Sequence, residues 1–344
     1  MTIETCTNGI RVMTVAGSPE HMGLELGREL GHEINLLFRA RYAIVRRACG
    51  LAEDAIETAC RRLWRAIETN TPAVALEAGA AATASGLASW QMVIAGGYTD
   101  ALDVLGAVGI DQAECTIGVR RNGPTIFGTW DSHPEAREGM LVLRRLPDVG
   151  ISTLALTTAG WPCQFGINAM GVGFGITNLT PSRSAPDGII YIAALADAVA
   201  ETTARSAAAR LGRLPLASGH FYLFVDDTDA ELVETTSSGV RRRPSTETLV
   251  ETNHYTTGID DNGRYCYLEG SQRRAWEMEA ALPTFDSPQA FAEWLPNSHY
   301  VWRHEPSGTA VTCAAFAVAV GSRGLWVSPG DRPQEMAFVP LVPD

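Results

Sequence analysis

Cys115 and Asp131 stand at the outer ends of a short pattern that predicts a β-hairpin. The apolar runs 116–119 and 125–127 flank Arg-Arg-Asn-Gly, and Asn-Gly between β-prone runs is a strong signal for a tight turn. Because hairpin strands are antiparallel, Cys115 should lie close to Asp131. A thiol in a polar, partly exposed setting with a nearby base can act as a nucleophile. The alternative is a buried structural cysteine that serves as a small apolar side chain.

The residues of this hairpin resemble the start of the catalytic chain in a known enzyme family. Cys-Thr, a strand, an Asn-Gly turn, a second strand and Gly-x-Trp130-Asp131 are similar to the penicillin acyltransferase family. This family includes isopenicillin N acyltransferase and bacterial relatives, which are N-terminal-nucleophile (Ntn) hydrolases. Its members are made as inactive precursors that cut themselves just before the cysteine. The resemblance therefore implies that the bond between Glu114 and Cys115 is cut and that Cys115 becomes the first residue of a new chain.

Further phrases follow in the order found in that family. They are Gly17-Ser18-Pro19 with Gly23 and Gly27, Gly-x-Asn168-x-x-Gly with Asn178, Thr252-Asn253-His254, and Ser271-x-x-Arg274. The resemblance implies that Asn253 supplies part of an oxyanion hole, that Asn178 lies near the substrate carbonyl, and that Arg274 is the active-site arginine. Arg273 stays an alternative to Arg274. Turn formation is the structural alternative for Asn168, Asn178 and the Asn253-His254 pair.

The chemistry that the resemblance implies depends on the new chain terminus. The free α-amino group of Cys115, with a reference pKa of about 7.7 to 8, would accept the thiol proton. Arg274 would stabilise the thiolate, and Asp131 would orient the amine. Attack on an amide or thioester carbonyl creates an oxyanion, which Asn253 and Asn178 would meet. Water or an amine would then take the acyl group from sulfur.

Two departures from the family pattern concern processing and substrate contacts. Glu114 stands where the best-known members carry glycine, and glycine permits the strained backbone that an N-to-S acyl shift favours. We therefore expect Glu114 to slow or alter the cut. The phrase ending in Trp130-Asp131 is one residue shorter than the family's common Gly-Gln-Asn-Trp-Asp, so the nearest substrate contacts are expected to differ. If the chain is not cut, His254 is the first alternative base.

Composition excludes several classes of function. The 344 residues are 46% hydrophobic, enough to bury a large core. A net charge of −12 argues against nucleic acid or an anionic membrane as a partner. All 27 basic residues are arginine, which excludes Schiff-base, Walker and kinase lysines. Seven cysteines without a CxxC pair and seven histidines without HxxxH spacing predict no disulfide framework, metal or cofactor. With no signal-peptide pattern, we expect the cytoplasm.

The elements that must position these residues change in type near residue 109. A strand at the sheet edge is expected over 9–16, and helices over 19–38, 51–67, 73–87 and 90–103, the first starting at a Ser18 cap. Later strands are expected over 140–143, 151–157, 218–226, 231–236, 309–320 and 325–330, with one helix over 187–211 and a turn at 241–243. Gly171, Gly173 and Gly175 lack the Gly-x-Gly-x-x-Gly spacing of a dinucleotide loop.

Pattern and resemblance together predict an α+β protein. The expected fold is the four-layer αββα Ntn sandwich, with two antiparallel sheets between helical layers and an α-rich N-terminal segment before them. Residues 1–114 would form a small chain and residues 115–344 a large chain, packed as one unit and free to assemble further as a homo-oligomer.

The expected activity follows from the same resemblance. It implies a cysteine amidohydrolase or acyltransferase of secondary metabolism, made as a zymogen, that acts on a small acyl or amide substrate, with acyl-CoA among the candidates. Two alternatives stay open. One is a non-catalytic relative that binds a small acyl or amide ligand. The other is an uncut Cys-His hydrolase that uses His254.

Overall fold

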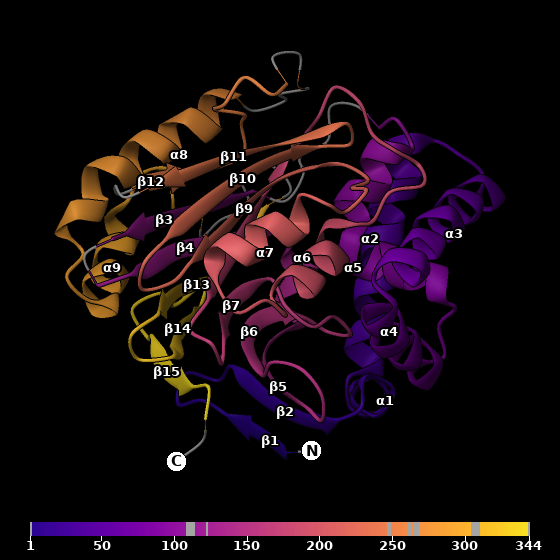
Figure 1. The fold of residues 1–344 in the computed structure, drawn as a ribbon, viewed down its shortest axis with the longest axis horizontal. Helices are drawn as coiled ribbons and strands as arrows, with labels where there is room; N and C mark the ends of the chain where they lie inside the picture. Colours follow the sequence, from indigo (N-terminus) through magenta and orange to yellow (C-terminus); the bar gives the residue numbers. More distant parts are fainter. Residues whose placement is uncertain are drawn as a thin grey trace.

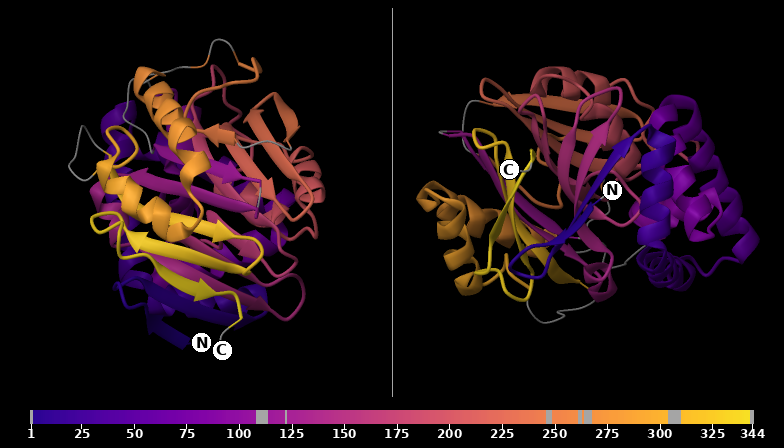
Figure 2. Two further views of the ribbon diagram at one scale, coloured as in Figure 1. Left: turned by 90° about the vertical axis from the view of Figure 1, so that its left-hand side faces the viewer. Right: turned by 90° about the horizontal axis from the view of Figure 1, so that it is seen from below.

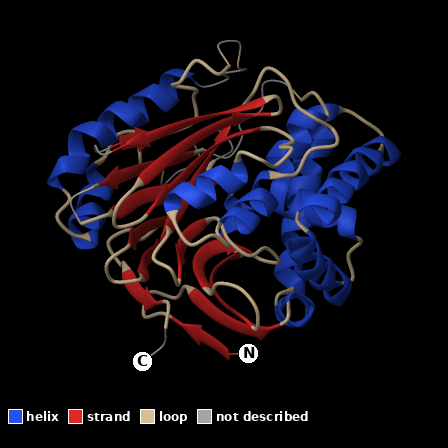
Figure 3. Cartoon of the chain, in the orientation of Figure 1, coloured by secondary structure: helices blue, strands red, loops and turns tan. Residues whose placement is uncertain are grey.

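The computed structural model describes residues 2–107, 114–121, 123–245, 249–260, 263, 268–303 and 310–342. Within these residues two β-sheets lie face to face, with helices outside them (Figures 1 and 3). The larger sheet has the order β1 (Thr2–Thr5), β2 (Arg11–Gly17), β5 (Met140–Pro147), β6 (Thr153–Thr158), β7 (Phe165–Asn168), β8 (Gly173–Leu179), β9 (Gly219–Val225), β10 (Ala230–Thr236), β11 (Gly239–Ser245). The smaller sheet has the order β12 (Leu249–Glu251), β3 (Cys115–Arg120), β4 (Thr125–Ser132), β13 (Val311–Ala319), β14 (Gly324–Pro329), β15 (Ala337–Pro340).

Helices cover both outer faces of this pair of sheets (Figure 2). α8 (Leu268–Ala281) and α9 (Pro288–Trp294) pack on the smaller sheet, with the short 3-10 helices η2 (Leu282–Thr284) and η3 (Leu295–Asn297) beside them. On the other side α7 (Ala204–Leu211) packs on β9 and β10, and α6 (Tyr191–Ala198) lies next to α7. The predicted four-layer α+β sandwich is therefore confirmed. Every described pair of neighbouring strands is antiparallel except β2 with β5, which is parallel.

The N-terminal third supplies a bundle of helices and two strands of the larger sheet. The helices are α1 (Pro19–Glu29), α2 (Gly31–Cys49), α3 (Glu53–Asn70), α4 (Pro72–Ser85) and α5 (Ser89–Val104). α1 packs on β2, β5 and α4. None of the described helices is long and apolar enough to cross a membrane.

Side chains of β3 and β4 alternate between two hydrophobic cores. Ile117 and Trp130 face the larger sheet, where Phe165 packs 4.4 Å from Phe316 between ring centres. Phe127 faces the helices and packs against Phe285, with ring centres 5.5 Å apart. This period of two follows from the pleat of a strand, and it turns the side chain of residue 115 toward the space between the sheets.

Two predictions about the N-terminal elements were partly wrong. Ser18 caps α1 as expected, because its Oγ accepts a hydrogen bond from the His21 N–H at 3.2 Å. However, the chain leaves helical geometry at Leu30, where φ is −110° and ψ is 17°, so two helices replace the expected one. The strand expected at the sheet edge is β2, which lies inside the sheet because β1 pairs with its free side.

Two later predictions were also wrong. The expected helix over 187–211 is two short helices, because the backbone at Gly188 packs directly against that of Ala217 and a Thr203 cap starts α7. The expected turn at 241–243 belongs to β11, an edge strand in which Arg242 pairs with Glu231 at 3.1 Å.

Candidate active site

The predicted hairpin exists and brings Cys115 and Asp131 together. Cys115 pairs with Trp130 across β3 and β4, and the next residue, Asp131, donates its backbone N–H to the carbonyl oxygen of Glu114 at 2.9 Å. Asn122, in the predicted turn, lies outside the described residues. The chain is continuous through the bond between Glu114 and Cys115, so the contacts described are those of the uncut chain.

The thiol of Cys115 is buried, contrary to the expectation of partial exposure. Only 5% of the residue is exposed, because its side chain lies between the two sheets. Burial, and secondarily the negative charge of Asp131, raise the pKa of the thiol far above its usual value. The Cys115 backbone N–H donates to Asn253 Oδ1 at 3.0 Å. In the uncut chain the thiol is therefore protonated, and its own nitrogen is an amide that cannot act as a base.

Arg274, rather than Arg273, lies at this site. Arg274 is 1% exposed; one of its nitrogens donates to the carboxylate of Glu114, and the other donates to Asn253 Oδ1 at 2.7 Å. The Arg273 side chain is 51% exposed, pairs with Glu269 one turn away, and lies 5.4 Å from the ring centre of Tyr300. The position one step earlier on α8 therefore points away from the sheets.

Asn253 joins three elements around Cys115. It follows β12, and its backbone N–H donates to Ser271 Oγ on α8 at 2.8 Å. Its side-chain Nδ2 donates to the backbone carbonyl of Asn178 on β8 at 2.8 Å. The Asn253 side chain is therefore fixed between the larger sheet, the first residue of β3 and Arg274 of α8.

The remaining polar residues of the family phrases have different surroundings. Asn168 Oδ1 accepts from the N–H groups of Met170 and Val172, both at 3.0 Å, which makes it a turn-forming residue. His254 Nδ1 is 2.8 Å from Ser271 Oγ. Burial, followed by the charge of Arg274, lowers the pKa of His254. None of the hydrogen bonds found in the described residues joins His254 to Cys115.

Glu114 and Arg303 form a contact that the sequence did not predict. Arg303 Nη2 donates to Glu114 Oε2 at 2.7 Å, and the same oxygen accepts from Arg274. The backbone of Arg303 is held at the start of β13, because its N–H donates to Thr312 Oγ1 and its carbonyl accepts from Thr312 N–H, both at 2.9 Å. The sequence around Arg303 contains no recognisable motif. Arg303 contacts Glu114, the residue before Cys115, only because the fold brings these distant segments together.

Asp131 carries a buried carboxyl group with spare hydrogen-bonding capacity. Neither oxygen accepts a well-formed hydrogen bond from the described residues, although the Thr312 hydroxyl is near enough to favour the ionised form. Burial raises the pKa of Asp131 to about 6, against the opposing charges of Arg303 and Arg274. A buried acceptor without a donor is costly, so this site favours a new N–H donor beside Asp131.

A small cavity adjoins the thiol. It has a volume of about 30 Å³, and its lining includes Cys115, Trp130, Phe165, Ile176 and Asn178, with Thr99, Gln164, Tyr191 and His220 at its polar side. That volume holds a water molecule and little more. His220 Nε2 lies within hydrogen-bonding distance of Asp100 Oδ1, at 2.6 Å, in the wall of the cavity.

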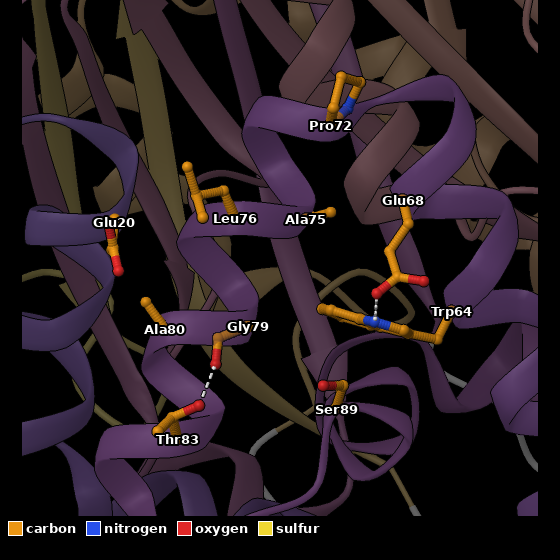
Figure 4. A pocket seen from close by; sticks show the side chains of 10 residues that line it. All are labelled: Glu20, Trp64, Glu68, Pro72, Ala75, Leu76, Gly79, Ala80, Thr83 and Ser89. Carbon is orange, nitrogen blue, oxygen red and sulfur yellow. Dashed lines mark hydrogen bonds between the residues drawn. The ribbon is translucent and has the colours of Figure 1, made fainter.

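A larger hollow of about 460 Å³ lies among the N-terminal helices and shares no lining residue with that cavity (Figure 4). It is lined by Glu20, Trp64, Glu68, Pro72, Ala75, Leu76, Gly79, Ala80, Thr83 and Ser89. Trp64 Nε1 donates to Glu68 at 2.8 Å, and Thr83 Oγ1 donates to the carbonyl of Gly79 at 3.0 Å. No hydrogen bond found in the described residues joins its hydroxyl groups, Thr83 and Ser89, to Glu20 or Glu68.

Comparison with known protein families identifies the family of this chain. The model of the family described as acyl-coenzyme A:6-aminopenicillanic acid acyl-transferase matches residues 119–332, more than half of the chain. The chain belongs to this family. The matched part of this acyl-transferase family member contains Asp131, Asn253, Arg274 and Arg303, and it begins four residues after Cys115. The resemblance noted in the sequence is confirmed, and the protein is an Ntn amide hydrolase or acyl-transferase.

Solved structures with a similar chain path include two enzymes. A mutant of the conjugated bile acid hydrolase from Clostridium perfringens has a TM-score of 0.45 and 11% identity, over 67% of this acyl-transferase family member and 92% of that chain. Penicillin V acylase from Agrobacterium tumefaciens has a TM-score of 0.34 and 9% identity, over 64% and 77%. No curated protein sequence matches the chain.

Proposed function

We propose that the protein cuts its own chain between Glu114 and Cys115 and then uses Cys115 as the nucleophile of an amide hydrolase or acyl-transferase. The observation that carries this proposal is the set of groups gathered at that one bond: Asn253 and Arg274 beside the nitrogen of Cys115, and Asp131 across the hairpin. A disulfide or a purely structural cysteine needs no such surroundings.

The cut would begin with attack of the Cys115 sulfur on the carbonyl carbon of Glu114. A C–S bond forms and the C–N bond breaks, while the departing nitrogen takes up a proton to become the α-amine of Cys115. Water then hydrolyses the thioester, which leaves Glu114 with a free α-carboxylate at the end of the first fragment and restores the thiol of Cys115. The new amine would lie beside Asn253 Oδ1 and could donate to the unsatisfied carboxyl oxygens of Asp131.

In the cut enzyme the α-amine of Cys115 would take the thiol proton. The thiolate would attack a substrate carbonyl, and the amide of Asn253, which donates to the carbonyl of Asn178, would also donate to the oxyanion. The ammonium returns its proton to the leaving amine. Water then hydrolyses the acyl-enzyme, or a second amine takes the acyl group.

The test is intact mass and denaturing electrophoresis of the wild type, Cys115→Ala and the control Cys163→Ala, whose cysteine is buried away from the cut. We expect the wild type and the control to split after residue 114, and Cys115→Ala to stay whole. A whole wild-type chain that turns over amides and loses that activity in His254→Ala would instead support the Cys-His hydrolase.

A further inference from the structure

The side chain of Glu114 occupies a built anion site next to the nucleophile. Its carboxylate is nearly buried and accepts from both Arg274 and Arg303, the second at 2.7 Å. Arginine pairs with carboxylates through a planar fork of donors, which makes two converging guanidinium groups a specific site for that group.

Charge balance changes at this site when the chain is cut. In the uncut chain the carboxylates of Glu114 and Asp131 face the guanidinium groups of Arg274 and Arg303. The cut adds the positive α-amine of Cys115 and removes the covalent tether that holds Glu114 in place. If Glu114 leaves, the buried Arg274 and the 15%-exposed Arg303 both lose the carboxylate that they bond, and Asp131 alone faces two guanidinium groups. Incompletely balanced charge in such a place is unfavourable. The vacated site therefore favours an anionic ligand.

The position of that anion relative to the reacting carbonyl is set by Glu114 itself. During self-cleavage Glu114 is the acyl donor, because its carbonyl carbon is the one that Cys115 attacks. Three carbon atoms separate this carbonyl from the side-chain carboxylate, the same spacing as in a glutaryl group. The neighbouring cavity of about 30 Å³ has room for about one water molecule and is too small for an apolar acyl chain of this length.

We propose that Arg274 and Arg303 form a carboxylate subsite, which Glu114 fills before the cut, and that the mature enzyme prefers acyl donors with a terminal carboxylate at glutaryl spacing. This inference rests on the proposed self-cleavage and on Cys115 as the nucleophile. Glu114 is thus the first acyl donor, and until the cut its side chain occupies the subsite that later substrates use.

The subsite can be tested without cleavage, in full-length chains that carry Cys115→Ala. Calorimetric titration with glutarate should show at least tenfold tighter binding when Glu114→Gly is added, and Arg303→Gln should abolish that gain. Uncharged glutaramide should not bind, and melting curves show that each chain is folded. Equal affinity of folded chains with and without Glu114, or equal binding of glutaramide, would overturn the subsite whether or not the wild type cuts itself.

Turnover gives a second test, on the wild type. We expect kcat/KM for glutaryl p-nitroanilide to exceed that for pentanoyl p-nitroanilide at least tenfold. Arg303→Gln should remove this preference mainly through KM, whereas the exposed neighbour variant Arg273→Gln should keep it. A preference for the pentanoyl compound would contradict the inference alone. Absence of cleavage and of all turnover would contradict the proposed function, while the glutarate titration would still decide the subsite.

Discussion

A single buried carboxylate, that of Glu114, links the two guanidinium groups of the site to the bond whose cleavage we propose. Glycine at this position would allow backbone strain, but it would offer those guanidinium groups no partner. Glu114 lacks the conformational freedom of the glycine found in the best-known family members. Its side chain is instead held in place by Arg274 and Arg303.

Arg274 and Arg273 provide a matched pair of variants at the residue scale. We expect Arg274→Gln to slow self-cleavage about 100-fold, since it removes a buried charge that holds Glu114 and favours the thiolate, an effect of roughly 3 kcal/mol. Arg273→Gln should cut at a rate within twofold of the wild type, because its side chain points to solvent. The fraction of cut chain over time, measured by intact mass, distinguishes them, and equal rates would contradict the assignment.

Asp131 should impose a pH dependence on the stability of the uncut chain. Its pKa is about 6 in the folded protein, against an ordinary value of 3.8, so the folded state holds the proton more tightly. The stability that this proton contributes is complete below pH 4 and is lost as pH rises through 6, by up to about 3 kcal/mol.

Urea unfolding of the Cys115→Ala chain from pH 4 to pH 7 measures this loss against the same chain with Asp131→Asn. The difference between the two free energies of unfolding should change across that window. A constant difference would show that Asp131 keeps its ordinary pKa in the fold.

The residues of the site could be predicted where a local phrase carries them. Cys115 and Asp131 follow from the hairpin, and Asn253 and Arg274 from short phrases, and the structure brings all four together. Arg303 could not be predicted, because its role depends on a contact between segments 189 residues apart. Long-range pairing is a property of the fold and leaves no trace in the neighbouring sequence.

At the scale of elements, capping and turn signals predicted where some helices and strands begin. They did not predict where a helix is interrupted. The Ser18 cap and the β3–β4 hairpin were predicted, since each depends on a few adjacent residues. The break at Leu30 was not predicted, and the division of 187–211 was missed, where the Gly188 backbone packs on Ala217 and a Thr203 cap starts α7. Local propensity yields to tertiary contact at such places.

The glycines of α1 explain how closely two helices approach. A Cβ atom at Gly23 would overlap the backbone carbonyl of Glu77 and lie 2.8 Å from the Cβ of Ala80 on α4. We expect Gly23→Ala to lower the free energy of unfolding by about 1–3 kcal/mol, because the helices must separate. Gly31→Ala is the control, since its nearest contact would be an ordinary 3.6 Å, and it should be neutral or slightly stabilising. Urea unfolding of the Cys115→Ala chain checks both, and equal effects would contradict this packing.

At the scale of the whole molecule, the segment before the proposed cut pairs and packs with elements that follow the cut. β1 and β2 belong to the larger sheet, and β2 pairs with β5 from the segment after the cut, while α5 packs on α6. The sequence predicted an α-rich leading segment, but period-two alternation over a few residues could not show which strand β2 would join.

The two fragments should therefore remain together after cleavage. We expect them to elute as one species in size-exclusion chromatography without denaturant and to separate only in urea, because dissociation would expose the edge of β5 and the core beneath α1. Separate elution under native conditions would show that the strand pairing does not survive the cut.

Both guanidinium groups that hold Glu114 are encoded in the last quarter of the chain, after the hairpin that they serve. A ribosome that has produced the hairpin but not yet residue 303 holds a nascent polypeptide without this clamp. Under the proposed reaction, maturation should therefore be slow until the segment through residue 303 has been made and folded.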